Sequence, residues 1–163
     1  MKNDFLGSKR SAVFCLIFQD DNILLIKRKY PPHQGYYVPI GGKIDAFETP
    51  DQAVIREVKE ESGYAISNPN FSGILVETSP LDYNWISFIY KVDVSEYIPH
   101  DCDEGELMWV PIKNISNFPI PETDSFIYDY CISNTPFIFD AVFDEDMKLN
   151  SLRCKLSQNQ LIG

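Results

Sequence analysis

The segment from Thr49 to Ser62 constrains the fold of this chain most strongly, because it carries a complete set of helix signals. Thr49 is a favoured N-cap residue, Pro50 suits the first helical position, and Gln52 completes a T-x-x-Q capping box. Gly63 follows at the position where helices commonly end. We therefore predict a helix over Thr49–Ser62.

Shorter apolar and β-branched segments surround this helix and predict a sheet. The expected strands are Ser11–Gln19, Ile23–Lys27, Tyr36–Ile40, Ser72–Glu77, Trp85–Asp93, Leu107–Pro111, Phe137–Phe143 and Lys148–Lys155. Two further helices are expected near Ile112–Asn117 and Glu122–Ile132. The acidic and amide residues at 20–22 and 144–146 are typical of hairpin turns. Since the sequence has no internal repeat and no Gly/Ser linker, we predict one domain over residues 1–163.

Composition excludes several classes of protein. The chain has 163 residues, of which 44% are hydrophobic and 23% charged, the balance of an ordinary globular domain with a core. The apolar stretches Ser11–Gln19 and Trp85–Tyr90 are far shorter than the roughly 20 residues of a membrane-spanning helix. Met1–Arg10 lacks the apolar run of a signal peptide. We expect a soluble cytoplasmic protein with no membrane partner.

The net charge of −10 argues against long nucleic acids as partners, because binding them requires basic side chains that neutralise phosphates. An acidic protein still suits a small phosphorylated ligand if its carboxylates first collect divalent cations. The four cysteines form no C-x-x-C pair and have no nearby histidine at zinc-finger spacing, so we expect reduced, buried thiols. Trp85 and Trp109 are assigned to the core.

Three acids share one face of the predicted helix, because residues three and four apart lie on the same side: Glu57, Glu60 and Glu61. Gly41 and Gly42 begin the loop before the helix, and Glu48 makes that loop more acidic. Arg56 lies where its guanidinium can fork onto carboxylates. Acidic oxygen ligands beside a glycine turn suit a hard cation such as Mg²⁺ or Mn²⁺.

Taken together, these residues resemble the Nudix box, G-x5-E-x7-R-E-U-x-E-E-x-G-U. All seven fixed letters are present, from Gly42 through Glu48 and the run R-E-V-K-E-E-S-G, and only Tyr64 departs from the aliphatic residue usual at the last position. The box covers 23 residues, and the order of the surrounding elements extends the resemblance over most of the chain. It implies a Nudix-type α/β/α sandwich with a mixed sheet, the helices Thr49–Ser62 and Glu122–Ile132 lying on opposite sides.

The resemblance also implies an activity, the hydrolysis of a nucleoside diphosphate linked to another moiety with the help of Mg²⁺ or Mn²⁺. The metal-binding positions of the family correspond to Gly41 (through its carbonyl), Glu57, Glu60 and Glu61. Glu48 and Arg56 match the positions that brace the loop against the helix. Lys43 resembles the lysine of the MutT-type G-G-K start and is expected to contact a phosphate.

Within the family, residues Asp101–Ile127 resemble the branch that hydrolyses oxidised purine nucleoside triphosphates. Glu104, five residues before Trp109, falls where that branch places a remote acid that binds metal or acts as a base. Glu106 is the competing loop acid, and an exposed loop glutamate is the plain alternative for both. Asp124 falls where a base-recognising acid occurs, although capping of the late helix also explains an aspartate there.

Two departures from that branch affect base recognition. Val38 replaces an asparagine that reads the base edge, and Pro121 replaces a stacking tryptophan. We therefore assign base recognition to other groups, namely Tyr36, Tyr37, Asp124 and Phe126.

The predicted reaction is hydrolysis of an ordinary or oxidised purine nucleoside triphosphate, such as 8-oxo-dGTP, to the monophosphate and pyrophosphate. A nucleotide-sugar or ADP-ribose pyrophosphatase is the enzyme alternative, and a nucleotide-sensing domain without hydrolysis is the alternative of another class. The expected partner is a small nucleotide, and the sequence leaves a homodimer open.

Overall fold

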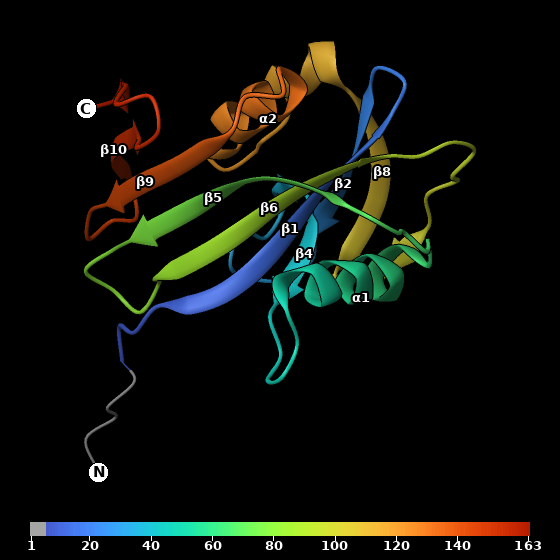
Figure 1. Ribbon diagram of the computed structural model, residues 1–163, viewed down its shortest axis with the longest axis horizontal. Coiled ribbons are helices and arrows are strands. Elements are labelled where there is room, and N and C mark those ends of the chain that lie inside the picture. The colour runs from blue at the N-terminus through green and yellow to red at the C-terminus, as the bar shows by residue number, and fades with distance from the viewer. Residues whose placement is uncertain (1–5) are drawn as a thin grey trace.

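A mixed sheet forms the middle layer of this computed structural model, which describes residues 6–163 (Figure 1). Its strands are β1 (Arg10–Gln19), β2 (Asn22–Arg28), β3 (Tyr37–Val38), β4 (Ile40–Lys43), β5 (Asn70–Thr78), β6 (Trp85–Asp93), β7 (Asp101–Cys102), β8 (Gly105–Pro111), β9 (Phe137–Phe143), β10 (Leu149–Cys154) and β11 (Gln160–Ile162). They run in the order β11-β10-β9-β5-β6-β1-β2-β8-β7, with β3 paired to β2 and β4 to β1. The pairs β1–β6 and β5–β9 are parallel and the others antiparallel.

Two α-helices cover opposite sides of the sheet, α1 (Pro50–Ser62) and α2 (Asp124–Ile132), as Figure 1 shows. Strand β1 contributes to both packed layers because successive side chains of a strand point to opposite faces. Val13 and Ile17 pack with α1, whereas Leu16 and Phe18 pack with α2. The α/β/α sandwich with a mixed sheet is therefore confirmed, and it has one apolar layer on each side of β1.

Helix α1 forms for the local reasons that the sequence indicates. The Thr49 side chain accepts a hydrogen bond from the Gln52 N–H at 3.2 Å, and the Gln52 side chain accepts one from the Thr49 N–H at 2.8 Å. Gly63 ends the helix with a φ of 71°, a left-handed conformation that glycine adopts without steric cost. Val54 and Val58 are fully buried, and Glu61 and Glu57 lie at the edge of this buried face, whereas Glu60 points further toward solvent.

Most of the remaining elements match the prediction, and the differences are short. The predicted strand Tyr36–Ile40 covers β3 and only the first residue of β4, and Gly41 and Gly42, which were expected to begin a loop, pair with β1 inside β4. The short strands β7 and β11 were not predicted, because two or three residues carry too little pattern. Residues Ile112–Asn117 form a 3₁₀ helix, and α2 begins two residues later than expected. The cysteine thiols are all free, three of them buried and Cys102 half-buried.

Within the described part of the chain, no helix is both long enough and apolar enough to cross a membrane. Half of the Met1–Arg10 segment, which we expected to hold no export signal, lies outside the described residues.

Candidate active site

A cavity of about 470 Å³ lies between the sheet, the α1 acids and the start of α2. At one end, the box end, its lining consists of Arg28, Gly41, Gly42, Lys43, Glu57, Glu61 and Glu104. At the other, the inner end, the lining includes Leu75, Glu77, Tyr83, Trp85, Ser87, Asp124, Ile127 and Tyr128. Elements from across the sequence therefore meet around one space.

Strand register explains how the two ends connect. Lys43 of β4 lies opposite Ala12 of β1, Ala12 lies beside Ser87 of β6, and Ser87 lies opposite Leu75 of β5. All four residues line the cavity, and neighbouring strands are about 4.8 Å apart, so this row crosses about 14 Å of sheet. Glu77 lies two residues beyond Leu75 on β5. The cavity thus extends across the sheet, roughly perpendicular to the strands, from β4 over β1 and β6 to β5.

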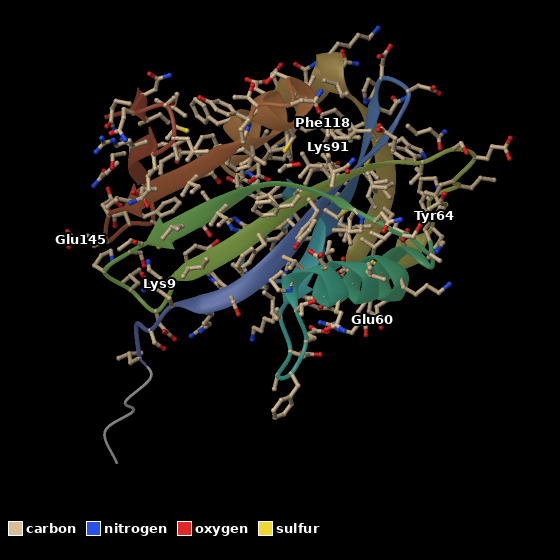
Figure 2. All side chains as sticks on the ribbon, viewed as in Figure 1. Lys9, Glu60, Tyr64, Lys91, Phe118 and Glu145 are labelled. Atoms are coloured by element: carbon tan, nitrogen blue, oxygen red, sulfur yellow. The ribbon has the colours of Figure 1, made fainter. Side chains whose placement is uncertain are left out.

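The α1 acids reach the box end because β4 carries glycines there. A Cβ atom at Gly42 would overlap the Glu57 carboxylate, so glycine at this position leaves room for that carboxylate in its present orientation. The Gly41 N–H donates a hydrogen bond of 3.2 Å to Oε2 of Glu61. Glu60 differs from both, since its side chain is 58% exposed and lies on the outer side of α1 (Figure 2).

Arg56 ties the loop before α1 to the helix. Its Nε and Nη2 atoms donate to the two oxygens of Glu48 at 3.0 and 2.5 Å, and Nη2 also donates to the Lys43 carbonyl at 3.1 Å. Its Nη1 atom donates to Glu57 at 2.8 Å and to Glu60 at 3.2 Å. This geometry fits the bracing arrangement that the resemblance implied for Glu48 and Arg56.

The glutamates at the box end have pKa values shifted in opposite directions. Hydrogen bonds from Arg56 lower the pKa of Glu48 to about 2. Burial, followed by the charge of Glu57, raises the pKa of Glu61 to about 8. Burial also raises the pKa of Glu57, against the opposing effect of Arg56. A positive charge placed in the cavity would favour ionised Glu57 and Glu61, because both are disfavoured as anions by burial.

The donor atoms at the box end suit a hard cation. The Glu57 and Glu61 carboxylates and the Gly41 backbone line one wall, and carboxylate and carbonyl oxygens are the ligands that Mg²⁺ and Mn²⁺ prefer. Among residues 6–163, no three acidic, histidine or cysteine side chains are already gathered around a single metal position, since Arg56 engages Glu57 and Glu60. Binding of a cation would therefore require these side chains to turn.

Two of the five residues predicted to bind substrate reach the cavity, and Tyr36 is exposed and outside its lining. Lys43 and Asp124 line it, at the box end and the inner end. Tyr37 is not part of the lining and packs edge-on against Phe118, with ring centroids 5.0 Å apart. Phe126 is also outside the lining and packs against the core on the α2 side.

The two competing loop acids are separated by the structure. Glu104 lines the cavity, and its Oε2 atom lies 3.6 Å from Nη1 of Arg28. Glu106, on β8, is exposed and lies opposite Lys27 of β2, outside the lining. Of the two, only Glu104 faces the other groups of the box end.

Several lining residues were missed by sequence reasoning. Arg28 ends β2, one residue beyond the predicted strand Ile23–Lys27, and nothing in the local sequence pattern pointed to a site there. Trp85 was assigned to the core, but it is half-buried and lines the inner end next to Tyr83, with ring centroids 6.4 Å apart. Glu77 and Ser87 are buried polar residues within apolar strands. An isolated polar residue on the inward face of a strand is the signal that was available for both.

Comparisons with known proteins agree with this arrangement. The NUDIX domain family profile matches residues 8–130. The Nudix hydrolase YvcI of Bacillus subtilis is 31% identical over 121 residues, which cover 71% of this chain and 75% of YvcI. An ADP-ribose pyrophosphatase of Methanocaldococcus jannaschii is 48% identical over 52 residues, or 32% of this chain and 31% of that protein.

Solved structures show the same fold. A MutT protein from Bacillus halodurans superimposes with a TM-score of 0.78 at 25% identity, covering 90% of this chain and 98% of that one. The NUDIX domain of Shewanella oneidensis NrtR, solved with ADP ribose, has a TM-score of 0.67 at 15% identity, covering 82% and 92%. At that identity the second likeness concerns the fold alone.

Proposed function

This chain belongs to the NUDIX domain family and is a Nudix hydrolase, and we propose that its substrate is a purine nucleoside triphosphate, hydrolysed to the monophosphate and pyrophosphate. The carrying observation is the shape of the cavity. Acidic and basic groups suited to phosphates and cations lie at the box end, and an aromatic and apolar wall with buried polar groups lies about 14 Å across the sheet. A nucleotide has the same two-part chemistry, a polyphosphate at one end and a flat ring at the other.

The likeness to the MutT protein from Bacillus halodurans supports this choice, because it extends over nearly the full length of both chains. The G-G-K start on β4 points the same way, since Lys43 lines the box end where phosphates would lie. Arg28 adds a second basic side chain at that end.

The residues of this chain divide the reaction among them. Gly41, Glu57 and Glu61 line the box end and would hold the divalent cation, Mg²⁺ or Mn²⁺, and Glu60 would join them only if its side chain turned in from the outer side of α1. When bound, that cation neutralises phosphate oxygens and lowers the pKa of a water molecule.

Lys43 and Arg28 orient the phosphate chain by charge. Glu104, held toward the cavity beside Arg28, accepts the proton of the water that attacks phosphorus. The ion pair between Arg56 and Glu48 holds the loop before α1 against the helix during this step.

ADP-ribose is the second candidate substrate. It is favoured by one observation, the 48% identity over 52 residues to the ADP-ribose pyrophosphatase of Methanocaldococcus jannaschii. That match covers about a third of each chain, whereas the MutT likeness covers most of both. ADP-ribose also carries a purine, so the inner end alone does not separate the two substrates.

Product analysis separates them. Purified protein with Mg²⁺ is incubated with dGTP, 8-oxo-dGTP, dATP, ADP-ribose and a nucleotide sugar, and initial rates and products are measured. The proposal expects pyrophosphate and a nucleoside monophosphate from a purine triphosphate. It would be overturned if ADP-ribose or the nucleotide sugar had about a hundredfold higher kcat/KM than every triphosphate, roughly 2.7 kcal/mol in transition-state binding. Binding without any product would instead identify a nucleotide sensor.

A further inference from the structure

The inner end of the cavity holds three buried polar side chains from three separate elements. Glu77 of β5 is 7% exposed, Ser87 of β6 is 0% exposed, and Asp124 at the start of α2 is 8% exposed. All three line the cavity, among apolar neighbours such as Leu75 and Ile127. A folded core rarely accepts such groups without partners, so their hydrogen bonds need to be accounted for.

The hydroxyl of Ser87 has no hydrogen-bond partner among residues 6–163, although it is fully buried. Leaving a buried polar group unpaired costs about 1–3 kcal/mol. Ser87 is part of the cavity lining although its hydroxyl oxygen is shielded from solvent, so a molecule bound there would reach this hydroxyl only if the side chain rotated toward it.

The two carboxyl groups are engaged to different degrees. Asp124 accepts hydrogen bonds from the Tyr128 hydroxyl at 3.1 Å and from the Thr123 hydroxyl at 3.4 Å. Lys9 donates to the backbone carbonyl of Glu77 at 2.5 Å, and also to Thr78 and Asn84 (Figure 2 shows Lys9 beside the ends of β5 and β6). The Glu77 carboxyl is thus left to face the cavity and the charge of Asp124.

The walls next to these groups suit a flat ring. Trp85 and Tyr83 provide aromatic surface, and Leu75 and Ile127 provide aliphatic surface. Carboxylates only accept hydrogen bonds, so the complementary ring edge carries adjacent N–H donors. The N1–H and N2–H₂ groups of a guanine-type base form such an edge, whereas adenine offers one N–H₂ donor beside a ring nitrogen that is an acceptor.

We propose that Glu77 determines base specificity, accepting hydrogen bonds from the adjacent N–H groups of a guanine-type ring, with Ser87 and Asp124 as supporting contacts. Two hydroxyl groups already hold the Asp124 carboxyl in place, whereas Lys9 donates to the backbone carbonyl of Glu77 and leaves the Glu77 carboxyl to the cavity, so Glu77 carries the discrimination. This inference deepens the proposed function and rests on it for the identity of the substrate. It assigns the role left open where Val38 stands in place of a hydrogen-bonding residue.

The test compares Glu77→Gln with Asp140→Asn as a matched control. Both variants replace a strand carboxylate by an amide of the same size, but Asp140, on the neighbouring β9, pairs with Lys155 at 3.1 Å and is outside the cavity lining. Because the introduced amide presents a donor as well as an acceptor, the ratio of kcat/KM for dGTP to that for dATP should fall about tenfold or more in Glu77→Gln. The ratio should stay unchanged in Asp140→Asn.

A second readout does not depend on hydrolysis. Binding of dGMP and dAMP without metal is followed by tryptophan fluorescence, since Trp85 lines the cavity while Trp109 donates to the Tyr97 carbonyl elsewhere. Loss of dGMP binding in Glu77→Gln supports the inference even if the wild type cleaves no triphosphate, in which case the proposed function fails alone. A folded Glu77→Gln variant that keeps the wild-type ratio and the wild-type dGMP affinity would overturn the inference and leave the proposed function standing. A wild-type protein that binds neither nucleotide and cleaves neither triphosphate would overturn both.

Discussion

The two ends of the cavity hold acidic groups under different conditions. At the box end, Arg56 forms ion pairs with Glu48 and Glu57, and the Gly41 N–H bonds Glu61. At the inner end, the buried Asp124 carboxyl accepts hydrogen bonds from two hydroxyl groups, and Lys9 donates to the backbone carbonyl of Glu77. In the proposed function, the box end exchanges its internal pairing for a cation and phosphates, whereas the inner end holds a neutral ring against buried carboxyl groups that accept its N–H groups when they are ionised.

Removing one box carboxylate should have the largest effect. Glu61→Gln keeps the size of the side chain but removes a negative charge from the group of expected cation ligands, so kcat should fall about a hundredfold or more. Steady-state turnover of the best substrate, with circular dichroism to verify folding, measures this. Full activity in Glu61→Gln, or in wild type treated with EDTA, would contradict the assigned role of the box end.

The next effect concerns the loop acids. Glu104→Gln should lower kcat about tenfold, because Glu104 lines the cavity and faces Arg28 as the expected proton acceptor. Glu106→Gln is the matched control and should change kcat less than about twofold, since Glu106 lies outside the lining. A larger loss at Glu106 than at Glu104 would show that the base was assigned to the wrong residue.

The two ends of the cavity also differ in how far the sequence alone could predict them. The α1 acids, Arg56 and the caps were predictable because they lie on one helix and the short loop before it, with Arg56 and Glu48 eight residues apart in the chain. The inner end was missed because it depends on strand register, which brings Leu75 and Ser87 side by side although no local pattern relates them. Tyr37 was placed in the site from its nearness in sequence to the glycines, yet its ring packs on Phe118.

A smaller effect, on the free energy of unfolding, should come from replacing the two hydrogen bonds between Arg56 and Glu48 by a single contact. Arg56→Lys cannot reproduce two parallel bonds to Glu48, so urea unfolding should show a loss of about 1 kcal/mol. Arg10→Lys is the control, because the pair of Arg10 with Asp82 is exposed and should be worth less than about 0.5 kcal/mol. Equal losses in the two variants would mean that Arg56 does not brace the loop.

The smallest effect is the part of the pH dependence of stability that the inner end contributes, in addition to the contribution of the half-buried Glu61. Burial, and for Glu77 also the charge of Asp124, raises the pKa of both carboxyl groups to about 7. The folded protein therefore binds more protons than the unfolded chain between about pH 4.5 and 7, so this contribution to stability is lost as the pH rises through that window.

Replacing Glu77 by Gln should weaken that dependence. Between pH 5 and pH 7.5, Glu77→Gln should gain stability relative to wild type by on the order of 1 kcal/mol, measured by urea unfolding at both values. Asp140→Asn should show no comparable gain, because Asp140 is half-exposed and paired with Lys155. A wild-type protein whose stability does not fall over this range would contradict the burial of the two carboxyl groups.

The division of work between the two ends is tested most directly by kinetics on both bases in one set of variants. Values of kcat/KM for dGTP and dATP are measured for wild type, Glu61→Gln, Glu77→Gln and the double variant. If the ends act separately, Glu61→Gln lowers both values by the same factor and Glu77→Gln changes their ratio. The double variant then shows the product of the two single effects. A Glu77→Gln variant that lowers both values equally, or a Glu61→Gln variant that changes the ratio, would contradict the division.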